Sequence, residues 1–301
     1  MSWTGTNGTL SDSIFINNSA NRGGCIYWNS GAINGTLIGS TFISNSASYG
    51  SGIYFRESNC ILTDCKFSNN HGSLGTIYFS TGNYDMNACI FINNSATNGA
   101  ALNCDDGTRV TISNCIFINN SATKQGGGIN CRYGTLIITD CIFINNSAAK
   151  QGGGICFTNL LNAYIYNSTF SGNSAEQGGA VYFWCISDIL DCNFTDNHAI
   201  YGDNVYWRYS AYNFLEKYNQ INDYDYVFIY ESRGTPAVGK PLNNIILNKK
   251  GVTIHGQSTN ITFDARGKNL HFEVTGDNVL IEGITFRNFN FTNGSGGAIL
   301  W

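Results

Sequence analysis

Hydrophobic and polar residues alternate along most of the chain with a period of two, in short runs interrupted by glycine and asparagine. This period places successive side chains on opposite faces of a β-strand, whereas a helix needs apolar residues three or four positions apart. β-branched and aromatic residues dominate the runs, and glycine clusters interrupt every candidate helix. The pattern therefore predicts an all-β protein.

The short runs belong to a repeat of about 25 residues. Each copy has the form [DN]-[CS]-x-F-x-x-N-x-A, then a polar turn, then G-G-x-[IV]-Y-[FW] and a more variable third run. Three short strands per copy, each lying on its counterpart one turn later, predict a right-handed, single-stranded parallel β-helix with layers ~4.8 Å apart. The central phenylalanines are Phe15, Phe42, Phe67, Phe91, Phe117, Phe143, Phe170 and Phe194.

The alternation also assigns side chains to the two faces of each strand. The central Phe, the small residue two positions before it and the last residue of the glycine motif are expected to point into the core. The residue before that last one is expected to point outward, at Tyr27, Tyr54, Tyr78, Asn103, Asn130, Cys156, Tyr182 and Tyr206. The tyrosines of this column are the candidate ligand-contact face, because exposed rings bind sugars or proteins. Stacked tyrosines also stabilise a sheet without a ligand, so both interpretations stay open.

An asparagine follows each central Phe by three positions in all eight copies. Stacked side-chain amides can each donate to one neighbouring layer and accept from the other, which satisfies groups that are costly to bury unpaired. The sequence therefore predicts an internal ladder formed by Asn18, Asn45, Asn70, Asn94, Asn120, Asn146, Asn173 and Asn197.

The repeat divides the chain into three parts. Residues 1–208 are expected to form the β-helix, 209–250 an irregular insert, linker or cap, and 251–301 the first turns of a second, truncated β-helical segment. Within the middle part we expect a short helix at AYNFLEKYNQI and a strand at DYDYVFIYE. The first and last residues of the chain each match only part of one repeat. We therefore expect the chain to be a segment of a longer polypeptide.

Composition narrows the possible partners. Charged residues are 12% of the chain and the formal net charge is -4. Without a run of Lys and Arg to displace counterions from phosphate, a nucleic-acid partner is not expected. Neither a membrane span nor a signal segment is recognisable, so an export signal or anchor would lie outside this segment.

The eleven cysteines are expected to be buried thiols that fill the core rather than disulfides or metal ligands. Cysteines stacked in one column have parallel Cβ vectors, which places their Cβ atoms farther apart than a disulfide prefers. Spacing of the CxxC kind is absent, so we expect no zinc and no other cofactor.

Catalytic candidates are few. Asp105 and Asp106 are the only adjacent carboxylates of the repeat region, with Arg109 nearby, but neighbouring strand residues point to opposite faces. A solvated turn is the simpler expectation. The four histidines have no recurring carboxylate or serine partner and are expected at the surface or in turns, at His71, His198, His255 and His271.

Two further surface features follow from the repeat. The outward isoleucine pairs Ile90/Ile92, Ile116/Ile118 and Ile142/Ile144 predict an apolar stripe that could support lateral self-association. N-x-[ST] sequons recur, although turn chemistry alone explains those within FINNSA. They lie at Asn7, Asn17, Asn34, Asn93, Asn119, Asn145, Asn167, Asn193, Asn260, Asn290 and Asn293.

The paired F-x-x-N and G-G-x-I motifs resemble the FxxN and GGAI repeats of polymorphic outer-membrane proteins. The motif FINNSA and the segment from VTIHG to VLIEGITF resemble sequences of adhesin-like surface proteins of methanogenic archaea. This resemblance implies an exported, extracellular or cell-surface protein whose β-helical stalk serves adhesion to glycans, host cells or partner cells.

Three functions remain open from the sequence. A non-enzymatic adhesin is the first hypothesis, a polysaccharide lyase or glycoside hydrolase on the same scaffold is the second, and a purely structural spacer is the third. An enzyme would need Asp, Glu, Arg or Lys side chains clustered in one outer groove, for example near Asp105.

Overall fold

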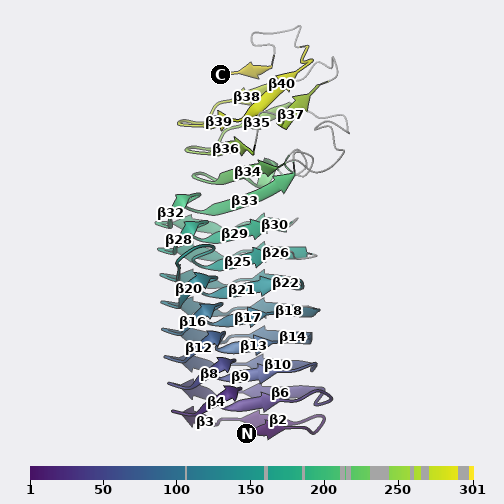
Figure 1. Cartoon of the computed structure of the whole chain (residues 1–301), viewed down its shortest axis with the longest axis vertical. Coiled ribbons are helices and arrows are strands. Elements are labelled where there is room, and N and C mark those ends of the chain that lie inside the picture. Colours follow the sequence, from purple (N-terminus) through teal and green to yellow (C-terminus); the bar gives the residue numbers. More distant parts are fainter. Residues whose placement is uncertain are drawn as a thin grey trace.

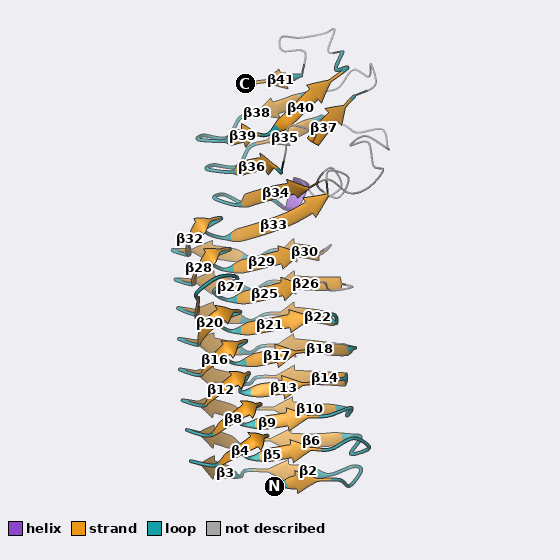
Figure 2. Ribbon diagram, in the orientation of Figure 1, coloured by secondary structure: helices purple, strands orange, loops and turns teal. Residues whose placement is uncertain are grey.

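The computed structural model shows a stack of short parallel strands that coils along one axis, with the two termini at opposite ends (Figures 1 and 2). The structure describes residues 1–105, 107–158, 162–184, 187–210, 214, 218–230, 244–257, 261–265, 271–290 and 298–301. Every strand pair in this part of the chain is parallel and joins equivalent positions of successive turns, as in Phe91, Phe117 and Phe143. The all-β parallel β-helix predicted from the sequence is confirmed.

Sheet A is the longest sheet and has twelve strands among the described residues. It runs through the full height of the stack (Figure 1). Its strands are β1 (Ser2–Trp3), β5 (Ile26–Trp28), β9 (Ile53–Phe55), β13 (Ile77–Phe79), β17 (Leu102–Cys104), β21 (Ile129–Arg132), β25 (Ile155–Thr158), β29 (Val181–Trp184), β33 (Val205–Ser210), β34 (Tyr226–Tyr230), β36 (Thr253–Gly256) and β39 (Leu280–Glu282).

Three more sheets, each of eight strands within the described ranges, complete the first eight turns. Sheet B consists of β2 (Thr9–Ser11), β6 (Gly35–Ile38), β10 (Cys60–Thr63), β14 (Gly82–Asn87), β18 (Thr108–Ser113), β22 (Thr135–Thr139), β26 (Asn162–Tyr166) and β30 (Ser187–Leu190). Sheet C consists of β3 (Ile14–Ile16), β7 (Thr41–Ile43), β11 (Lys66–Ser68), β15 (Ile90–Ile92), β19 (Ile116–Ile118), β23 (Ile142–Ile144), β27 (Thr169–Ser171) and β31 (Asn193–Thr195). Sheet D consists of β4 (Ser19–Arg22), β8 (Ser46–Tyr49), β12 (His71–Leu74), β16 (Ser95–Asn98), β20 (Ser121–Gln125), β24 (Ser147–Ala148), β28 (Ser174–Gln177) and β32 (His198–Tyr201).

The expected number of strands per turn, three, was one too few in this region. The segment after each ladder asparagine was expected to be a polar turn, but it forms the strands of sheet D. These strands keep backbone pairing between layers, as in Ser121↔Ser147 and Ala122↔Ala148. Two paired residues, Ser and Ala, are too few to show an alternation of polar and apolar positions. The strand can therefore be recognised only because the same segment recurs in every turn.

Beyond residue 210 the stack has a different cross-section. Sheet E consists of β35 (Ile245–Leu247), β38 (Phe272–Val274) and β41 (Ile299–Leu300), and sheet F of β37 (Ile261–Asp264) and β40 (Ile284–Arg287). Sheet A passes through both expected domain boundaries without a break, so the division at 208 and 250 stays a prediction. The expected strand at 223–231 is β34. Of the expected helix, the described residues include Phe214, which is helical and buried, and a 3₁₀ turn, η1 (Tyr218–Gln220).

Three corners in each of the first eight turns are formed by residues with a left-handed backbone. Their φ angles lie between 48° and 71°. Asn, Asp and Gly dominate these positions because they tolerate this conformation. At the corner between sheets D and A every residue is glycine, and a Cβ added to Gly126 would lie 2.3 Å from the carbonyl oxygen of Ile129. The glycine motif is therefore a steric requirement of this corner.

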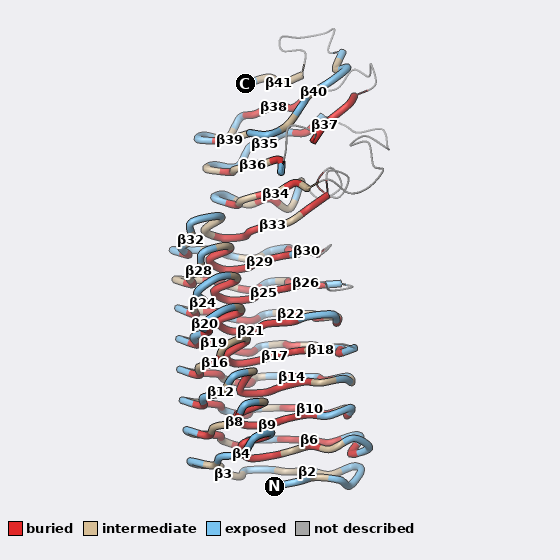
Figure 3. The backbone as a smooth tube through the Cα atoms, in the orientation of Figure 1, coloured by how far each residue is buried: buried red, intermediate tan, exposed pale blue. Residues whose placement is uncertain are grey.

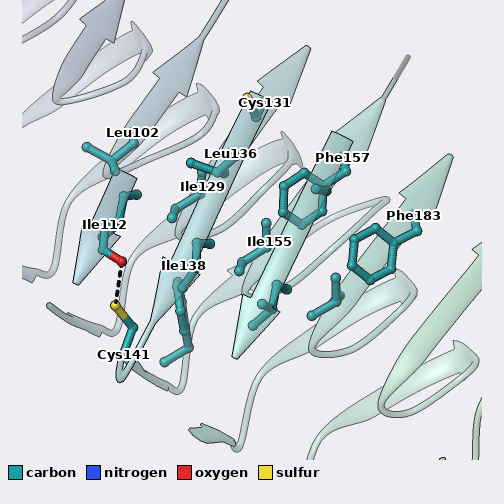
Figure 4. Packing of buried hydrophobic residues seen from close by; sticks show 14 of the residues in the cluster. Leu102, Ile112, Ile129, Cys131, Leu136, Ile138, Cys141, Ile155, Phe157 and Phe183 are labelled. Atoms are coloured by element: carbon teal, nitrogen blue, oxygen red, sulfur yellow. Dashed lines mark hydrogen bonds between the residues drawn. The ribbon is translucent and has the colours of Figure 1, made fainter. Parts of the chain in front are cut away.

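The interior consists of columns of equivalent side chains. The eight central phenylalanines stack with ring centroids 4.6–5.2 Å apart. Buried positions recur at the same place in successive turns (Figure 3). Figure 4 shows Ile129 and Ile155 on adjacent turns, and the Cys141 thiol donating to the carbonyl oxygen of Ile112 over 3.7 Å. The same residue types recur in the sequence because equivalent side chains stack on each other in successive turns.

The asparagine ladder is continuous through all eight turns. Each Nδ2 donates to the Oδ1 of the next asparagine over 2.9–3.0 Å, as from Asn94 to Asn120 and from Asn120 to Asn146. Each Oδ1 accepts a second bond from the backbone N–H of the asparagine one turn earlier, over 2.8–3.1 Å. From Asn45 onward, Nδ2 also donates to the carbonyl oxygen of the preceding turn's central Phe. At the last turn Asn197 continues the chain of bonds to Asn204 over 3.2 Å.

Nine of the described cysteines lie in the core columns, and Cys156 lies in the outer column of sheet A. Cys25, Cys60, Cys65, Cys89, Cys104, Cys115, Cys131, Cys141 and Cys192 are free thiols, and all except Cys192 are buried. Burial raises the pKa of the Cys25 thiol to about 12. Such a thiol is neutral and unreactive at physiological pH. Within the described residues no group of three or more His, Cys, Asp or Glu side chains could hold a metal ion.

Candidate functional site

The tyrosine column expected to form an exposed face is mostly covered. Its members lie on the outer side of sheet A, as the alternation indicates, but Tyr54, Tyr78, Tyr182 and Tyr206 are each at most 8% exposed. Tyr27, at the N-terminal end of the stack, is half-buried. The expectation of an open aromatic face along the whole stack is therefore wrong.

Sheet D covers this column. The ring of Tyr49, on β8, meets Tyr54 and Tyr78 edge-on, with centroids 6.4 and 5.5 Å apart. The guanidinium of Arg22, on β4, lies 5.8 Å from the Tyr54 ring centroid. Alternation assigns a face to a side chain, but it does not reveal which element lies over that face.

The cover ends where sheet D ends. Among the described residues the last strand of sheet D is β32, whereas sheet A continues through β34, β36 and β39 (Figure 1). A groove of about 850 Å³ opens over these strands, and we call it the sheet A groove. One wall comes from β28 and from residues 199–203, and the floor comes from the outer side chains of β33, β34, β36 and β39.

Aromatic rings form much of the floor. Tyr226 stacks on Tyr206 with centroids 5.2 Å apart, and Tyr201 from the wall meets Tyr226 edge-on at 5.4 Å. Phe228 stacks on His255 at 5.8 Å. Tyr226 and Phe228 are partly exposed, so the parts of their rings that are not stacked on neighbouring side chains are accessible in the groove. Burial, and next Glu282, raise the pKa of Tyr226, which keeps its hydroxyl protonated and able to donate a hydrogen bond.

A second row of outer side chains runs beside the first. The strand register aligns Arg208, Phe228, His255 and Glu282 on successive layers. The Arg208 guanidinium lies 4.0 Å from the ring centroid of Trp184 and 5.9 Å from that of Phe228. His255 Nδ1 lies 2.6 Å from Glu282 Oε1. This row therefore combines aromatic faces with hydrogen-bonding and charged groups.

Asp225 fixes the corner beneath the groove. Its carboxylate accepts hydrogen bonds from Val205 N at 3.0 Å, Trp207 Nε1 at 2.8 Å and Asn222 N at 2.8 Å. Burial raises the pKa of Asp225 to about 7, although these donors act in the opposite direction. The carboxyl group joins β33 to the turn that precedes β34, which positions Tyr226 on the floor.

The comparisons with known proteins address the fold. The family model described as "Right handed beta helix region" matches residues 2–152, half of the chain. This chain belongs to the right-handed β-helix family. A model of the Chlamydia polymorphic membrane protein repeat matches residues 167–183, one motif of this β-helix. The searches of curated proteins and of solved structures gave no match.

The carboxylates proposed from the sequence do not line the groove of this β-helix. Asp105 Oδ2 accepts a hydrogen bond from the Tyr78 hydroxyl over 2.7 Å, and Arg109 belongs to sheet B. Asp106 lies outside the described residues. Among the described residues, the partner of the Asp105 carboxylate is therefore the Tyr78 hydroxyl, and a catalytic role for this region stays untested.

The histidines of the β-helix have three different environments. His71 and His198 are exposed, as expected. His255 lies on the groove floor and is a site residue that the sequence analysis missed. His271 is 5% exposed, so the expectation of a surface position was wrong for it.

The other floor residues were missed for one reason. Tyr226 and Phe228 fall in the part expected to be irregular, and Glu282 falls in the second segment. The signal was present in DYDYVFIYE, where Tyr226, Phe228 and Tyr230 alternate with Val227 and Ile229 as in the repeat.

Two surface features of the β-helix remain as predicted sites. The sequon residues Asn93, Asn119 and Asn145 are exposed at left-handed corners, whereas Asn260 and Asn293 lie outside the described residues. Along sheet C, Ile142 is 37% exposed and Ile90 and Ile116 are half-exposed. Lateral association through this stripe stays a prediction, which sedimentation velocity would check. In the described part of the chain no helix is long and apolar enough to cross a membrane.

Proposed function

We propose that this chain is a non-enzymatic, adhesin-like segment of a cell-surface protein, in which the β-helix is a stalk and the sheet A groove binds glycans of a host or partner cell. The observation that carries the proposal is the groove floor, where partly exposed aromatic rings lie beside hydrogen-bonding groups. Pyranose rings have apolar C–H faces and polar edges, so a site of this kind matches them on both counts.

The family comparisons support the surface location. The match to a polymorphic membrane protein repeat covers a motif that recurs in eight turns of this chain. The resemblance of FINNSA and its neighbours to adhesin-like surface proteins of methanogenic archaea agrees with this location. A stack in which each layer contacts only its neighbours is also suited to extend a binding site away from a surface.

A glycan array with the purified chain tests the proposal. We expect binding to a subset of glycans, and we expect the double substitution Tyr226→Ala plus Phe228→Ala to abolish it, because both aromatic contacts are removed. The matched control is Tyr164→Ala plus Tyr166→Ala. These tyrosines are half-exposed on sheet B with ring centroids 6.1 Å apart, and they lie outside the groove.

The outcomes separate the hypotheses. Retained binding in the Tyr226/Phe228 variant, or equal loss in the control, would contradict binding in the groove. No binding to any glycan or cell surface would favour the structural spacer. Tyr54 and Tyr78 are unsuitable as ligand-contact variants, because they are buried and their loss would lower stability rather than remove a contact with the glycan.

A second candidate function is a polysaccharide lyase or glycoside hydrolase. The observation that favours it is the presence of Glu176, Asp203 and Glu282 in one groove, since sugar-cleaving enzymes use carboxylates as acid, base or nucleophile. Incubation with each bound glycan, followed by chromatography of the products, tests it. Shortened products that disappear with Glu282→Gln would favour the enzyme, whereas unchanged glycans would favour the adhesin.

A further inference from the structure

The lining of the sheet A groove is predominantly acidic. Glu176, Asp203 and Glu282 contribute carboxylates to its lining, and Asp225 lies beneath it. None of the described lining residues is a lysine or arginine. Arg208 lies next to the groove, but its guanidinium is held against Trp184 and Phe228.

The partners already present in the groove leave these carboxylates partly accessible. Asp203 accepts one hydrogen bond, from the backbone N–H of Ala199 over 2.7 Å. Glu282 is paired with His255, and its side chain stays 46% exposed. An anionic sugar brought to this floor would therefore meet repulsion from several directions, whereas a cationic sugar would form charge-assisted hydrogen bonds.

Two aromatic rings near the groove already contact cations of the chain itself. Arg208 lies over Trp184 at 4.0 Å, and the Lys250 Nζ lies 6.0 Å from the ring centroid of Tyr224, a lining residue. Both are cations placed on aromatic faces of the molecule's own groove rim. Tyrosine faces combined with carboxylates are a recurrent means of binding ammonium groups.

We propose that the groove selects glycans that carry protonated amino groups, such as chains of β-1,4-linked glucosamine, over their N-acetylated forms and over uronic acids. The inference rests on the proposed glycan-binding function and specifies its ligand class. The sugar rings contact the exposed parts of Tyr226 and Phe228, and an ammonium group is held by Glu282 on the same floor. N-acetylation removes the charge and keeps the ring, so it isolates the electrostatic contribution.

Isothermal titration with three tetrasaccharides tests the inference: the glucosamine tetramer, its fully N-acetylated form and tetragalacturonate. We expect the glucosamine tetramer to bind roughly tenfold or more tightly than the acetylated one, and the preference to weaken with salt. Glu282→Gln should reduce the preference. Asp85→Asn, which removes the same charge from an exposed site on sheet B, should leave it unchanged.

Each contrary result has a distinct meaning. Equal binding of the two glucosamine-derived tetramers, or tighter binding of tetragalacturonate, overturns the charge selection and leaves glycan binding in place. If Glu282→Gln keeps the full preference for the glucosamine tetramer, the preference comes from the net charge of the chain, and the inference is also overturned. The absence of binding by all three tetramers, together with an empty glycan array, refutes the proposed function itself.

Discussion

Replacing one ladder asparagine by aspartate tests the physical basis of the stack. In the native chain Asn120 Nδ2 donates to Asn146 Oδ1 over 2.9 Å and to the carbonyl oxygen of Phe91 over 3.0 Å. Its Oδ1 accepts two bonds from Asn94. Asn120→Asp keeps the acceptor side and replaces the donor by an oxygen, so two bonds become contacts between oxygens in a fully buried site.

The magnitude follows from the two acceptors that lose their donor. A buried polar group left without its hydrogen bond costs about 1–3 kcal/mol. Asn146 Oδ1 keeps the bond from the backbone N–H of Asn120, so its cost lies at the lower end. Burying a charge adds a further cost, so we expect the free energy of unfolding to fall by about 4 kcal/mol at pH 7.

The effect should depend on pH with a defined sign. Burial and the facing oxygens raise the folded-state pKa of the introduced carboxyl above its unfolded value of about 3.9. The folded state then binds the proton more tightly, and a protonated carboxyl restores one donor. The destabilisation should therefore be smallest below about pH 4 and should grow as the pH rises through the folded-state pKa.

The matched control is the neighbouring substitution Asn119→Asp. Asn119 is exposed at a left-handed corner with φ 53°, and the equivalent corner of the last repeat is Asp196 with φ 53°. We expect a change within about 0.5 kcal/mol. Urea denaturation of both variants at pH 4 and pH 7 measures the difference, and equal stability of the two variants at pH 7 would refute the ladder as a source of stability.

Three further predictions concern stability. The pKa of Asp225 is raised from 3.8 to about 7, so the contribution of Asp225 to the free energy of unfolding should be greatest below about pH 4 and should fall by a few kcal/mol as the pH rises to 7. Asp225→Asn should remove this part of the pH dependence in urea titrations. Gly126→Ala places a Cβ 2.3 Å from a carbonyl oxygen and should cost clearly more, by melting temperature, than Gly31→Ala, where only the left-handed strain of about 1–2 kcal/mol applies. Tyr54→Ala plus Tyr78→Ala should lower the free energy of unfolding by about 3 kcal/mol or more without changing glycan affinity, and weakened binding in a still folded variant would contradict the assigned site.

The sequence predicted those features that depend on equivalence between layers. The Phe column and the ladder follow from recurrence at a fixed interval, because a side chain that is identical in eight copies has an identical environment in each. The fourth strand was not predictable from alternation, since Ser147 and Ala148 alone define β24. Its strand character derives from the backbone of the layers on either side.

The groove could not be predicted by the same reasoning. Its floor depends on sheet D having no described strand above β32, which is a relation between sheets rather than a property of any residue. Tyr206 and Tyr226 have the same outward direction as Tyr54 and Tyr78. What distinguishes Tyr226 is that its layer has no described strand of sheet D, and no local pattern encodes that difference.

The position of the groove follows from a conflict between stacking and recognition. A repeated layer favours similar side chains in the layers above and below, and the outer face of sheet A is covered by sheet D in these layers. Distinct chemistry such as the His255–Glu282 pair can accumulate only where the repeat is relaxed. Sheet A resolves the conflict, because its backbone pairing continues from β33 to β39 while the outer side chains change at every layer. The end of sheet D therefore exposes a floor that is as regular in its backbone as the stalk and unique in its side chains.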